Sequence, residues 1–319
     1  MSTTETINRR YVGLDSWSDE AILSAFVEGQ ERAIAAVARA QSAIAAAARA
    51  IVSRVGGSGR IVYVGAGSSG LIAALDGVEL GGTFGWPDER MAFVLATGPT
   101  LRAGLPGESE DDVSRARAEI RALDLASDDA VIAVAASGTT GFTLAATAEA
   151  RDAGALTIGI ANNSEAPLLE RVDVPVLLDT GPEVIAGSTR MNAGTAQKAA
   201  LGLLSSLTMI RFGHTYDGLM VSLRADNAKL RRRAAATLMH ITGCRESEAT
   251  AVLDRCGGSV KCAALVLRGA APEDADRILR AFGGDLRNAL ARLNQGQAQR
   301  RKAGGHPVGG TKRKKGASQ

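Results

Sequence analysis

The sequence predicts an α/β fold: a doubly wound parallel sheet in a three-layer α/β/α arrangement, followed by a small all-helical C-terminal module. Short, fully apolar runs alternate along the chain with longer Ala-rich segments of helical composition. Parallel strands covered on both faces have continuous apolar sequences, and their pairing requires crossover connections that are usually helices. Two of the apolar runs are followed at once by loops rich in glycine and hydroxyl residues. In such a sheet, ligands bind beyond the carboxyl ends of the strands.

The composition favours a soluble protein of the cytoplasm. Of 319 residues 45% are hydrophobic but only 3% are aromatic, so the core must consist of Ala, Val, Leu and Ile. Cys244, Cys256 and Cys262 form no C-x-x-C pair and have only His240 nearby, which predicts no zinc site. An odd number of thiols suggests a reducing compartment, and the polar N-terminus lacks the features of a signal peptide. No run approaches the length of a membrane span.

Four regions follow from the change of pattern along the chain. Residues 1–55 hold a polar lead and, from Asp19, two long helices that Ser18 can cap. Residues 56–225 hold the sheet domain, and residues 226–294 hold short helices separated by glycines. Residues 295–319 carry Lys and Arg but no acid, and we interpret them as a disordered basic tail. Nucleic-acid binding by this tail is the less favoured alternative.

The strands and helices of the sheet domain are expected in a fixed order. Apolar runs predict strands, and the helical segments between them predict crossovers. The expected strands are 60–65, 130–135, 156–160 and 174–178, and the expected helices are a segment from 71 onward, 142–153 and 190–212.

The loop Gly65–Gly70 is the first candidate for a phosphate site. Its spacing satisfies G-x-G-x-x-G, but a dinucleotide site would need an acid after a second strand, and Glu89 lies in a polar stretch instead. Gly67, Ser68 and Ser69 combine free backbone amides at a helix start with hydroxyl donors, which suits a phosphate monoester. The alternative is that these residues only cap the helix.

Two further loops have similar chemistry. Ser137, Gly138, Thr139 and Thr140 follow the second expected strand, so both hydroxyl-rich loops should lie at the same sheet edge. The segment 181–190 follows the last strand and contains Glu183 and Ser188. Ser188 is expected to cap the helix from Arg190, and Glu183 is either a ligand-binding acid or a solvated loop acid.

These segments together resemble the N-acetylmuramic acid 6-phosphate etherases, enzymes with the sugar-isomerase (SIS) fold that are related to the glucokinase regulatory protein. The resemblance extends from about Ile7 to Leu290, and residues 181–198 are its most specific part. The segments that carry it are Gly65–Gly70, Ala135–Gly138, Gly181–Glu183, Gly187–Ser188, Arg190, Ala193–Lys198, Ala225–Leu230, Thr242–Cys244 and Gly257–Lys261.

The resemblance implies a lyase of amino-sugar and cell-wall recycling. The family removes the acidic C2 proton of an open-chain sugar, eliminates D-lactate from C3 and adds water, giving N-acetylglucosamine 6-phosphate. It implies no metal and no other cofactor, and it implies a homodimer in which residues of one subunit complete the site of the other.

The resemblance also implies two catalytic carboxyl groups. The proton donor of the family matches Glu79 in the segment 75–85, where Val78 and Leu80 predict apolar surroundings that favour a protonated acid. The second carboxyl matches Glu110, with Glu108 as the rival if the register of the loop differs. From the residues alone, this acidic stretch is a solvated helix start. Which glutamate is acid and which is base stays open.

The sequence departs from the family pattern at three cationic positions. Leu71, Thr139 and Asn192 stand where the family usually has Arg, Arg and Lys, whereas Arg190 and Lys198 are retained. If the missing cations contact phosphate in other members, this chain binds phosphate more weakly or binds a different sugar.

Two other functions stay open. An aldose–ketose isomerase would need a histidine at the site, and His214 and His240 do not lie in the expected sheet-edge loops. A sensor that binds a sugar phosphate without turnover would explain the missing cations.

Overall fold

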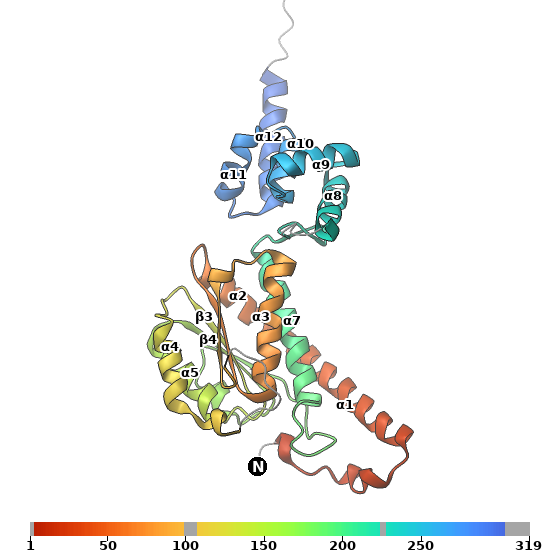
Figure 1. Ribbon diagram of the computed structural model, residues 1–319, viewed down its shortest axis with the longest axis vertical. Coiled ribbons are helices and arrows are strands. Elements are labelled where there is room, and N and C mark those ends of the chain that lie inside the picture. The colour runs from red at the N-terminus through yellow and green to blue at the C-terminus, as the bar shows by residue number, and fades with distance from the viewer. Residues whose placement is uncertain (1–2, 99–106, 224–227, 304–319) are drawn as a thin grey trace, which may run out of the picture. The chain divides into compact units, whose positions relative to one another are not determined.

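The computed structural model describes residues 3–98, 107–223 and 228–303, and it divides the chain into two compact units at the boundary between residues 224 and 225 (Figure 1). We call them the N-terminal and C-terminal units. The N-terminal unit holds the sheet and both hydroxyl-rich loops. Each unit is described by itself.

The N-terminal unit begins with the expected lead and two long helices. The lead forms short 3-10 turns at Thr3–Glu5, Arg9–Tyr11 and Leu14–Ser16, followed by α1 (Asp19–Arg39) and α2 (Gln41–Val55). The Ser18 hydroxyl accepts a hydrogen bond from the Ala21 amide at 3.3 Å, which confirms the predicted cap. In the described part of the chain no single helix is long and apolar enough to cross a membrane. Helices α1 and α2 together have the length and composition of a membrane span, but the chain is bent by 56° between them.

Five parallel strands form the sheet in the order β2-β1-β3-β4-β5. Their bounds are β1 (Ile61–Gly65), β2 (Met91–Leu95), β3 (Ala130–Val134), β4 (Leu156–Ala161) and β5 (Val174–Leu177). Four of them match the expected strands. The sequence analysis did not predict β2, because this edge strand is only half buried over Met91–Phe93 and directly follows the polar residues 88–90.

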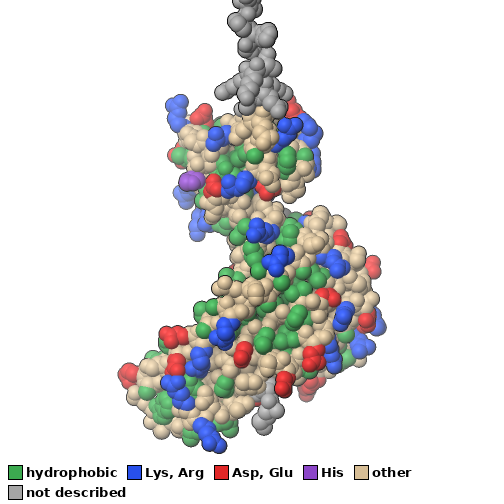
Figure 2. Space-filling view, turned by 180° about the vertical axis from the view of Figure 1, so that it is seen from behind, with side chains coloured by type: hydrophobic (Ala, Val, Ile, Leu, Met, Phe, Trp, Pro, Cys, Tyr) green, Lys and Arg blue, Asp and Glu red, His purple; other side chains and the backbone are tan. Residues whose placement is uncertain are grey.

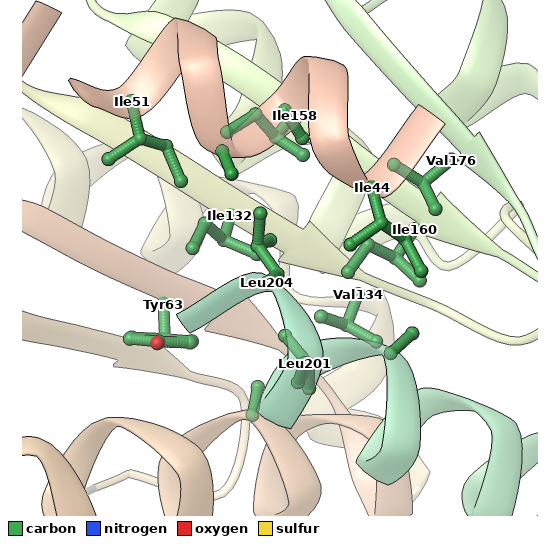
Figure 3. Packing of buried hydrophobic residues seen from close by; sticks show 14 of the residues in the cluster. Ile44, Ile51, Tyr63, Ile132, Val134, Ile158, Ile160, Val176, Leu201 and Leu204 are labelled. Atoms are coloured by element: carbon green, nitrogen blue, oxygen red, sulfur yellow. The ribbon is translucent and has the colours of Figure 1, made fainter. Parts of the chain in front are cut away.

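Helices cover both faces of the sheet, which confirms the predicted three-layer fold. One face packs on α2, α3 (Gly67–Phe84) and α7 (Asn192–Arg211), and Figure 3 shows Ile44, Ile132 and Leu201 in this layer. The other face packs on α4 (Val113–Ala122), α5 (Gly141–Asp152) and α6 (Pro167–Glu170). The cores are aliphatic and Ala-rich, as the composition predicted.

Helix α3 begins earlier than its sequence suggested. The expected start was residue 71, whereas the helix starts at Gly67, whose φ of +53° favours glycine. The backbones of Gly65 and Gly70 are so close that a Cβ at Gly70 would lie 2.8 Å from the Gly65 carbonyl carbon and oxygen. The two serines are therefore part of the first helical turn rather than of a loop before it.

The C-terminal unit is helical in its described residues. It contains α8 (Ala228–Thr242), α9 (Glu246–Arg255), α10 (Val260–Leu267), α11 (Pro272–Ala281) and α12 (Leu286–Ala303), with α10 in contact with the other four. Helix α12 reaches Ala303, so residues 295–303 are helical where the sequence analysis expected a disordered tail. Residues 304–319 of the predicted basic tail lie outside the described residues. The same holds for residues 225–227, the first part of the segment Ala225–Leu230.

The close approach at Gly70 gives a stability test. Gly70→Ala should lower the free energy of unfolding by about 1–3 kcal/mol, because the added carbon meets rigid backbone. Gly57→Ala is the matched control: no atom lies within 4 Å of its added Cβ, and its change should stay within about 0.5 kcal/mol. Urea unfolding of both variants measures the difference, and equal stabilities would show that α3 can move off β1 without cost.

Candidate active site

The strand order places a topological switch point between β1 and β3, and we call the region beyond their carboxyl ends the crevice. These strands are neighbours, but α3 leaves β1 toward one face of the sheet and α5 leaves β3 toward the other. The order β2-β1-β3-β4-β5 is that of flavodoxin-like sheets, in which such a switch point is the place where ligands bind. The first loop and the second loop are the two sides of this crevice.

The first side presents backbone amides and two hydroxyls. Ser68 is half buried and Ser69 is almost fully buried in the first turn of α3, and Ala66 provides no side-chain cap. The first amides of a helix have no partner within it, and they form its partially positive end. This end of α3 is therefore suited to an anion, and phosphate binding by Gly67, Ser68 and Ser69 stays a prediction.

The second side is a turn held by its own hydroxyl groups. The Ser137 Oγ accepts hydrogen bonds from the Thr139 amide at 3.2 Å and from the Thr139 hydroxyl at 3.0 Å. Gly138 has a φ of +69°, and a Cβ there would collide with Ala166. Thr140 precedes α5 and makes no side-chain cap bond to it. The amides at the start of α5 thus face the same edge as those of α3.

Glu110 is the acid that approaches these loops. It lies in the 3-10 turn Gly107–Asp111, and a Cβ added at Gly67 would be 2.6 Å from its Oε1. Its backbone carbonyl lies 3.7 Å from the place of a Cβ on Gly141. Burial, and then the Asp111 charge, raise the pKa of the Glu110 carboxyl. The turn therefore places a carboxyl group with raised proton affinity between the first turns of α3 and α5.

The neighbouring acids of this stretch have other surroundings. Asp112 caps α4 by accepting a hydrogen bond from the Arg115 amide at 2.9 Å, and Glu108 is exposed to solvent. The alternative interpretation, a solvated acidic start of a helix, thus fits Asp112 and Glu108. Glu110 is the acid of this stretch that approaches Gly67. Of the two rivals in the sequence analysis, the geometry favours Glu110.

Glu79 lies far from this crevice along α3. Twelve residues separate it from Gly67, a rise of about 18 Å. Its side chain is 57% exposed and pairs with Lys198 on α7 at 3.3 Å. The expected apolar surroundings are absent in the single chain, since Val78 is itself exposed. Within one chain, Glu79 and Glu110 do not meet at one site.

Glu183 is buried in the structure rather than exposed to a ligand. Its two carboxylate oxygens accept hydrogen bonds from the backbone amides of Asn192 and Ala193, both at 2.9 Å. It therefore caps the N-terminus of α7 from nine residues away. Burial raises the pKa of its carboxyl, while the two amide bonds act in the opposite direction.

The two remaining predicted binding residues, Ser188 and Lys198, lie at different places in the structure. Ser188 is half buried in the loop before α7, and Lys198 lies with Glu79. Of the three altered cationic positions, Leu71 is half buried, Thr139 is exposed, and Asn192 is fully buried against α1. A Cβ at Gly29 of α1 would collide with the Asn192 amide group, so the helices are packed closely at this point.

The sequence analysis missed a buried polar cluster beneath Glu79. Asp76 accepts hydrogen bonds from the Tyr63 hydroxyl at 2.7 Å and from the Ser205 hydroxyl at 3.0 Å. The sequence did contain a signal for this cluster. Asp76 lies three residues before the candidate acid Glu79, at a buried position of the largely apolar helix α3. Its partners on β1 and α7 are too distant in sequence to be recognised without the fold.

Comparison with known proteins identifies the family. A SIS-domain model matches residues 25–162. An N-acetylmuramic acid 6-phosphate etherase of Deinococcus radiodurans is 46% identical over 90% of this chain and 94% of its own length. One of Rubrobacter xylanophilus is 42% identical over 87% of this chain and 92% of its own. This chain belongs to the N-acetylmuramic acid 6-phosphate etherase family. A phosphoheptose isomerase structure from Francisella tularensis is also similar, with a TM-score of 0.46, 21% identity and coverage of 61% of this chain and 98% of its own.

Membership of the etherase family is consistent with the layout of the crevice. The relatives match along nearly their whole length, so the match includes the sheet, both hydroxyl-rich loops and the helical C-terminal unit. This confirms the resemblance seen in the sequence. The altered positions Leu71, Thr139 and Asn192 thus distinguish this chain from the pattern that the sequence analysis took as usual for the etherase family.

The cap of α7 in this etherase-family chain gives a second stability test. Glu183→Gln should destabilise the fold by about 1–3 kcal/mol, because its NH₂ group would face a backbone N–H that then lacks an acceptor. Ser188→Ala, a half-buried position in the same loop, should change stability by about 0.5 kcal/mol or less. Chemical denaturation of both variants gives the comparison. A neutral Glu183→Gln would show that the carboxylate does not hold α7.

Proposed function

We propose that this protein cleaves the D-lactyl ether of N-acetylmuramic acid 6-phosphate, producing N-acetylglucosamine 6-phosphate and D-lactate. The observation that carries the proposal is the Glu110 carboxyl against Gly67, between the two hydroxyl-rich helix starts, in a chain of the etherase family. A phosphate group and an acidic carbon of one substrate can then be held at a single crevice.

The substrate phosphate would be bound by amides and hydroxyls. The loops 65–70 and 136–141 contain no Lys or Arg, so their attraction for a dianion comes from the starts of α3 and α5 and from Ser68, Ser69, Ser137, Thr139 and Thr140. Hydrogen bonds from uncharged donors are weaker than those from Arg or Lys. We therefore expect modest phosphate affinity with weak dependence on salt.

Glu110 is suited to be the general base. In the open-chain sugar the C2–H bond is next to the C1 aldehyde, and a carboxylate that removes this proton leaves the electron pair delocalised onto the aldehyde oxygen. The C3–O bond then breaks, lactate leaves, and water adds at C3 while a proton returns to C2. A base whose pKa is raised toward the operating pH transfers protons more effectively than an ordinary carboxylate.

The leaving lactate needs a proton donor, and we propose Glu79 of a second subunit. Atoms C2 and C3 of the sugar are adjacent, whereas Glu79 and Gly67 of one chain are about 18 Å apart along α3. One chain thus cannot bring both carboxyls to the same sugar ring. A homodimer in which α3 of one subunit faces the crevice of the other would do so.

The surface around Glu79 supports this pairing. Large hydrophobic side chains are exposed on α3, on α7, which packs against α3, and on α1, which packs against α7. Figure 2 shows hydrophobic side chains exposed among charged ones on one face of the N-terminal unit. Such exposure is typical of a surface that another protein covers. The exposed residues are Leu75 and Val78 on α3, Leu203 and Ile210 on α7, and Leu23, Val27 and Ile34 on α1.

A second candidate activity follows from the missing cations. Leu71 follows the first phosphate loop, Thr139 lies within the second, and both are uncharged. A related lyase for another sugar phosphate, or a sugar-phosphate sensor without turnover, would have the same fold and crevice. Either would bind N-acetylglucosamine 6-phosphate or its analogues without releasing lactate. We place all these activities in the cytoplasm, in keeping with the free thiols of Cys244, Cys256 and Cys262.

The first test is release of D-lactate from N-acetylmuramic acid 6-phosphate. Glu110→Gln should lower kcat about 10²–10⁴-fold, the usual contribution of a general base. The acid limb of the wild-type kcat/KM profile should lie above about pH 4.3, where an ordinary glutamate titrates, because the pKa of Glu110 is raised. Full lactate release by Glu110→Gln would remove Glu110 from the mechanism.

Stability measurements separate this loss from misfolding. A carboxyl with a raised folded-state pKa contributes stability at low pH that is lost as the pH rises through that pKa. At pH 7 the ionised Glu110 therefore destabilises the fold, and Glu110→Gln should melt at the same or a slightly higher temperature. A large fall in Tm would mean that the variant reports on folding rather than on catalysis.

Mixed dimers test whether the site is shared. Glu79→Gln and Glu110→Gln should each be inactive alone, but random pairing of the two makes half of the dimers mixed, each with one intact site. The mixture should thus recover about a quarter of wild-type activity. Sedimentation and differently tagged subunits confirm that mixed dimers formed. No recovery in verified mixed dimers would contradict the shared site.

A further inference from the structure

We propose that Thr4 and Asn163 are positioning residues that join the N-terminal lead to two of the predicted binding loops and so fix the distance between them. These loops are the second loop, which contains Ser137, and the loop 181–190, which contains Ser188. No step described above uses Thr4 or Asn163. The inference rests on the proposed function in one respect: it takes both loops as parts of one sugar-phosphate site.

Thr4 is a buried residue in an exposed segment. It lies in the 3-10 turn Thr3–Glu5 and is 0% exposed, whereas the residues on either side of it are exposed. Its backbone carbonyl accepts a hydrogen bond from the Gly187 amide at 3.1 Å, and in Figure 1 the lead lies next to the loop that enters α7. Gly187 directly precedes Ser188, so the lead is attached to the loop 181–190 through the backbone.

Asn163 connects the same threonine to the second loop. It follows β4 and is only 5% exposed. Its Oδ1 accepts a hydrogen bond from the Thr4 amide, and its Nδ2 donates to the Thr4 Oγ1, both at 3.3 Å. The Nδ2 also donates to the Ala136 carbonyl at 2.7 Å. Ala136 directly precedes Ser137, so one side-chain amide extends from the lead to the start of the second loop.

The orientation of this buried amide is fixed by its bonds. Both hydrogens of an asparagine NH₂ group are donors, and here the Nδ2 has two acceptors and the Oδ1 has one donor. The Ala136 carbonyl also accepts a hydrogen bond from the Asn162 amide at 3.0 Å, which holds the second loop to the end of β4. What Asn163 adds to this attachment is the connection to the lead and, through Thr4, to the loop 181–190.

Binding by uncharged donors makes this placement important. The loops 65–70 and 136–141 contain no Lys or Arg, so no cationic side chain of these loops compensates for a donor that is out of place. A displacement of about 1 Å at a binding or reacting group can cost up to about 100-fold. If Thr4 and Asn163 were purely structural, their loss would lower stability but leave the affinity of the folded protein for a sugar phosphate unchanged.

Calorimetric titration of the full-length protein with N-acetylglucosamine 6-phosphate tests the link. Asn163→Leu removes three hydrogen bonds at similar side-chain size and should raise Kd about tenfold, whereas Thr4→Val removes one and should raise it about threefold. Thr4→Ser keeps the hydroxyl and should bind as the wild type does. Ser16→Ala, in the same lead, loses only a bond to the Gly13 carbonyl and should leave Kd unchanged. In lactate release KM should rise in parallel with Kd, with kcat within about threefold.

Two further measurements show whether the effect passes through the proposed contact. The double variant of Thr4→Val and Asn163→Leu should bind no more weakly than Asn163→Leu alone, because both changes break the same link. In the ligand-free protein, the Gly138 amide bonds to the Ala135 carbonyl at 3.1 Å, and the Thr139 amide bonds to a side chain of the same loop. Hydrogen exchange of these two amides should be faster in Asn163→Leu. If Asn163→Leu does not fold, Thr4→Val provides both measurements.

The possible results separate this inference from the proposed function. An unchanged Kd in folded Asn163→Leu, or in folded Thr4→Val if the former does not fold, would overturn the positioning role whatever the exchange rates show. A wild-type protein that binds the sugar phosphate without releasing lactate, and whose variants bind it more weakly, would overturn the etherase proposal alone. A wild-type protein that does not bind the sugar phosphate would overturn both.

Discussion

The close contact between the end of β1 and the first turn of α3 is the constraint on which the crevice depends. Gly65 and Gly70 allow the two backbones to touch, and the positive φ of Gly67 turns the chain directly into the helix. The free amides of this turn therefore lie at the carboxyl edge of the sheet, beside Glu110. A side chain at any of these positions would move the helix start, and with it Ser68 and Ser69. The same glycines that form the anion site thus limit how the sheet and the helix pack.

Much of this architecture could be predicted from the sequence because it depends on local pattern. The central strands are fully buried and are apolar throughout, as in β3, whereas the edge strand β2 is half buried and was not recognised. Glu110 was expected from the resemblance to the etherases, with Glu108 as its rival, but only the fold shows that Glu110 approaches Gly67 while Glu108 is exposed to solvent. Glu183 was expected to bind the ligand or to be a solvated loop acid, and ligand binding stays a prediction. Its cap on α7 was not foreseen, because an acid nine residues before a helix reaches it only when the intervening loop folds back. Pairs such as Glu79 with Lys198 are 119 residues apart and carry no local signal.

The crevice and the Glu79 cluster use different means to control charge. At the crevice, the positive end of a helix and neutral donors lie where we propose that the phosphate binds, and burial raises the pKa of the nearby Glu110. On the outer part of α3, the exposed Glu79 pairs with Lys198, and the buried Asp76 of the same helix bonds to two hydroxyl groups. Under the proposed function each arrangement needs the other, because Glu110 would serve as the base and Glu79 as the proton donor. A symmetric homodimer would bring together these two groups, which are separated along α3 of one chain.

This separation would connect the proposed homodimer to the proposed elimination step. A helix of fixed rise keeps Glu79 about 18 Å from Gly67 whatever the side chains do, so no rotamer change within one subunit can join the two carboxyls. The exposed hydrophobic residues Leu75 and Val78 lie on α3 within one turn of Glu79, and we propose that a second subunit covers them. The proposed interface would therefore supply the position of the proton donor, so that a separated subunit would keep its fold and its phosphate loops but lose the elimination step.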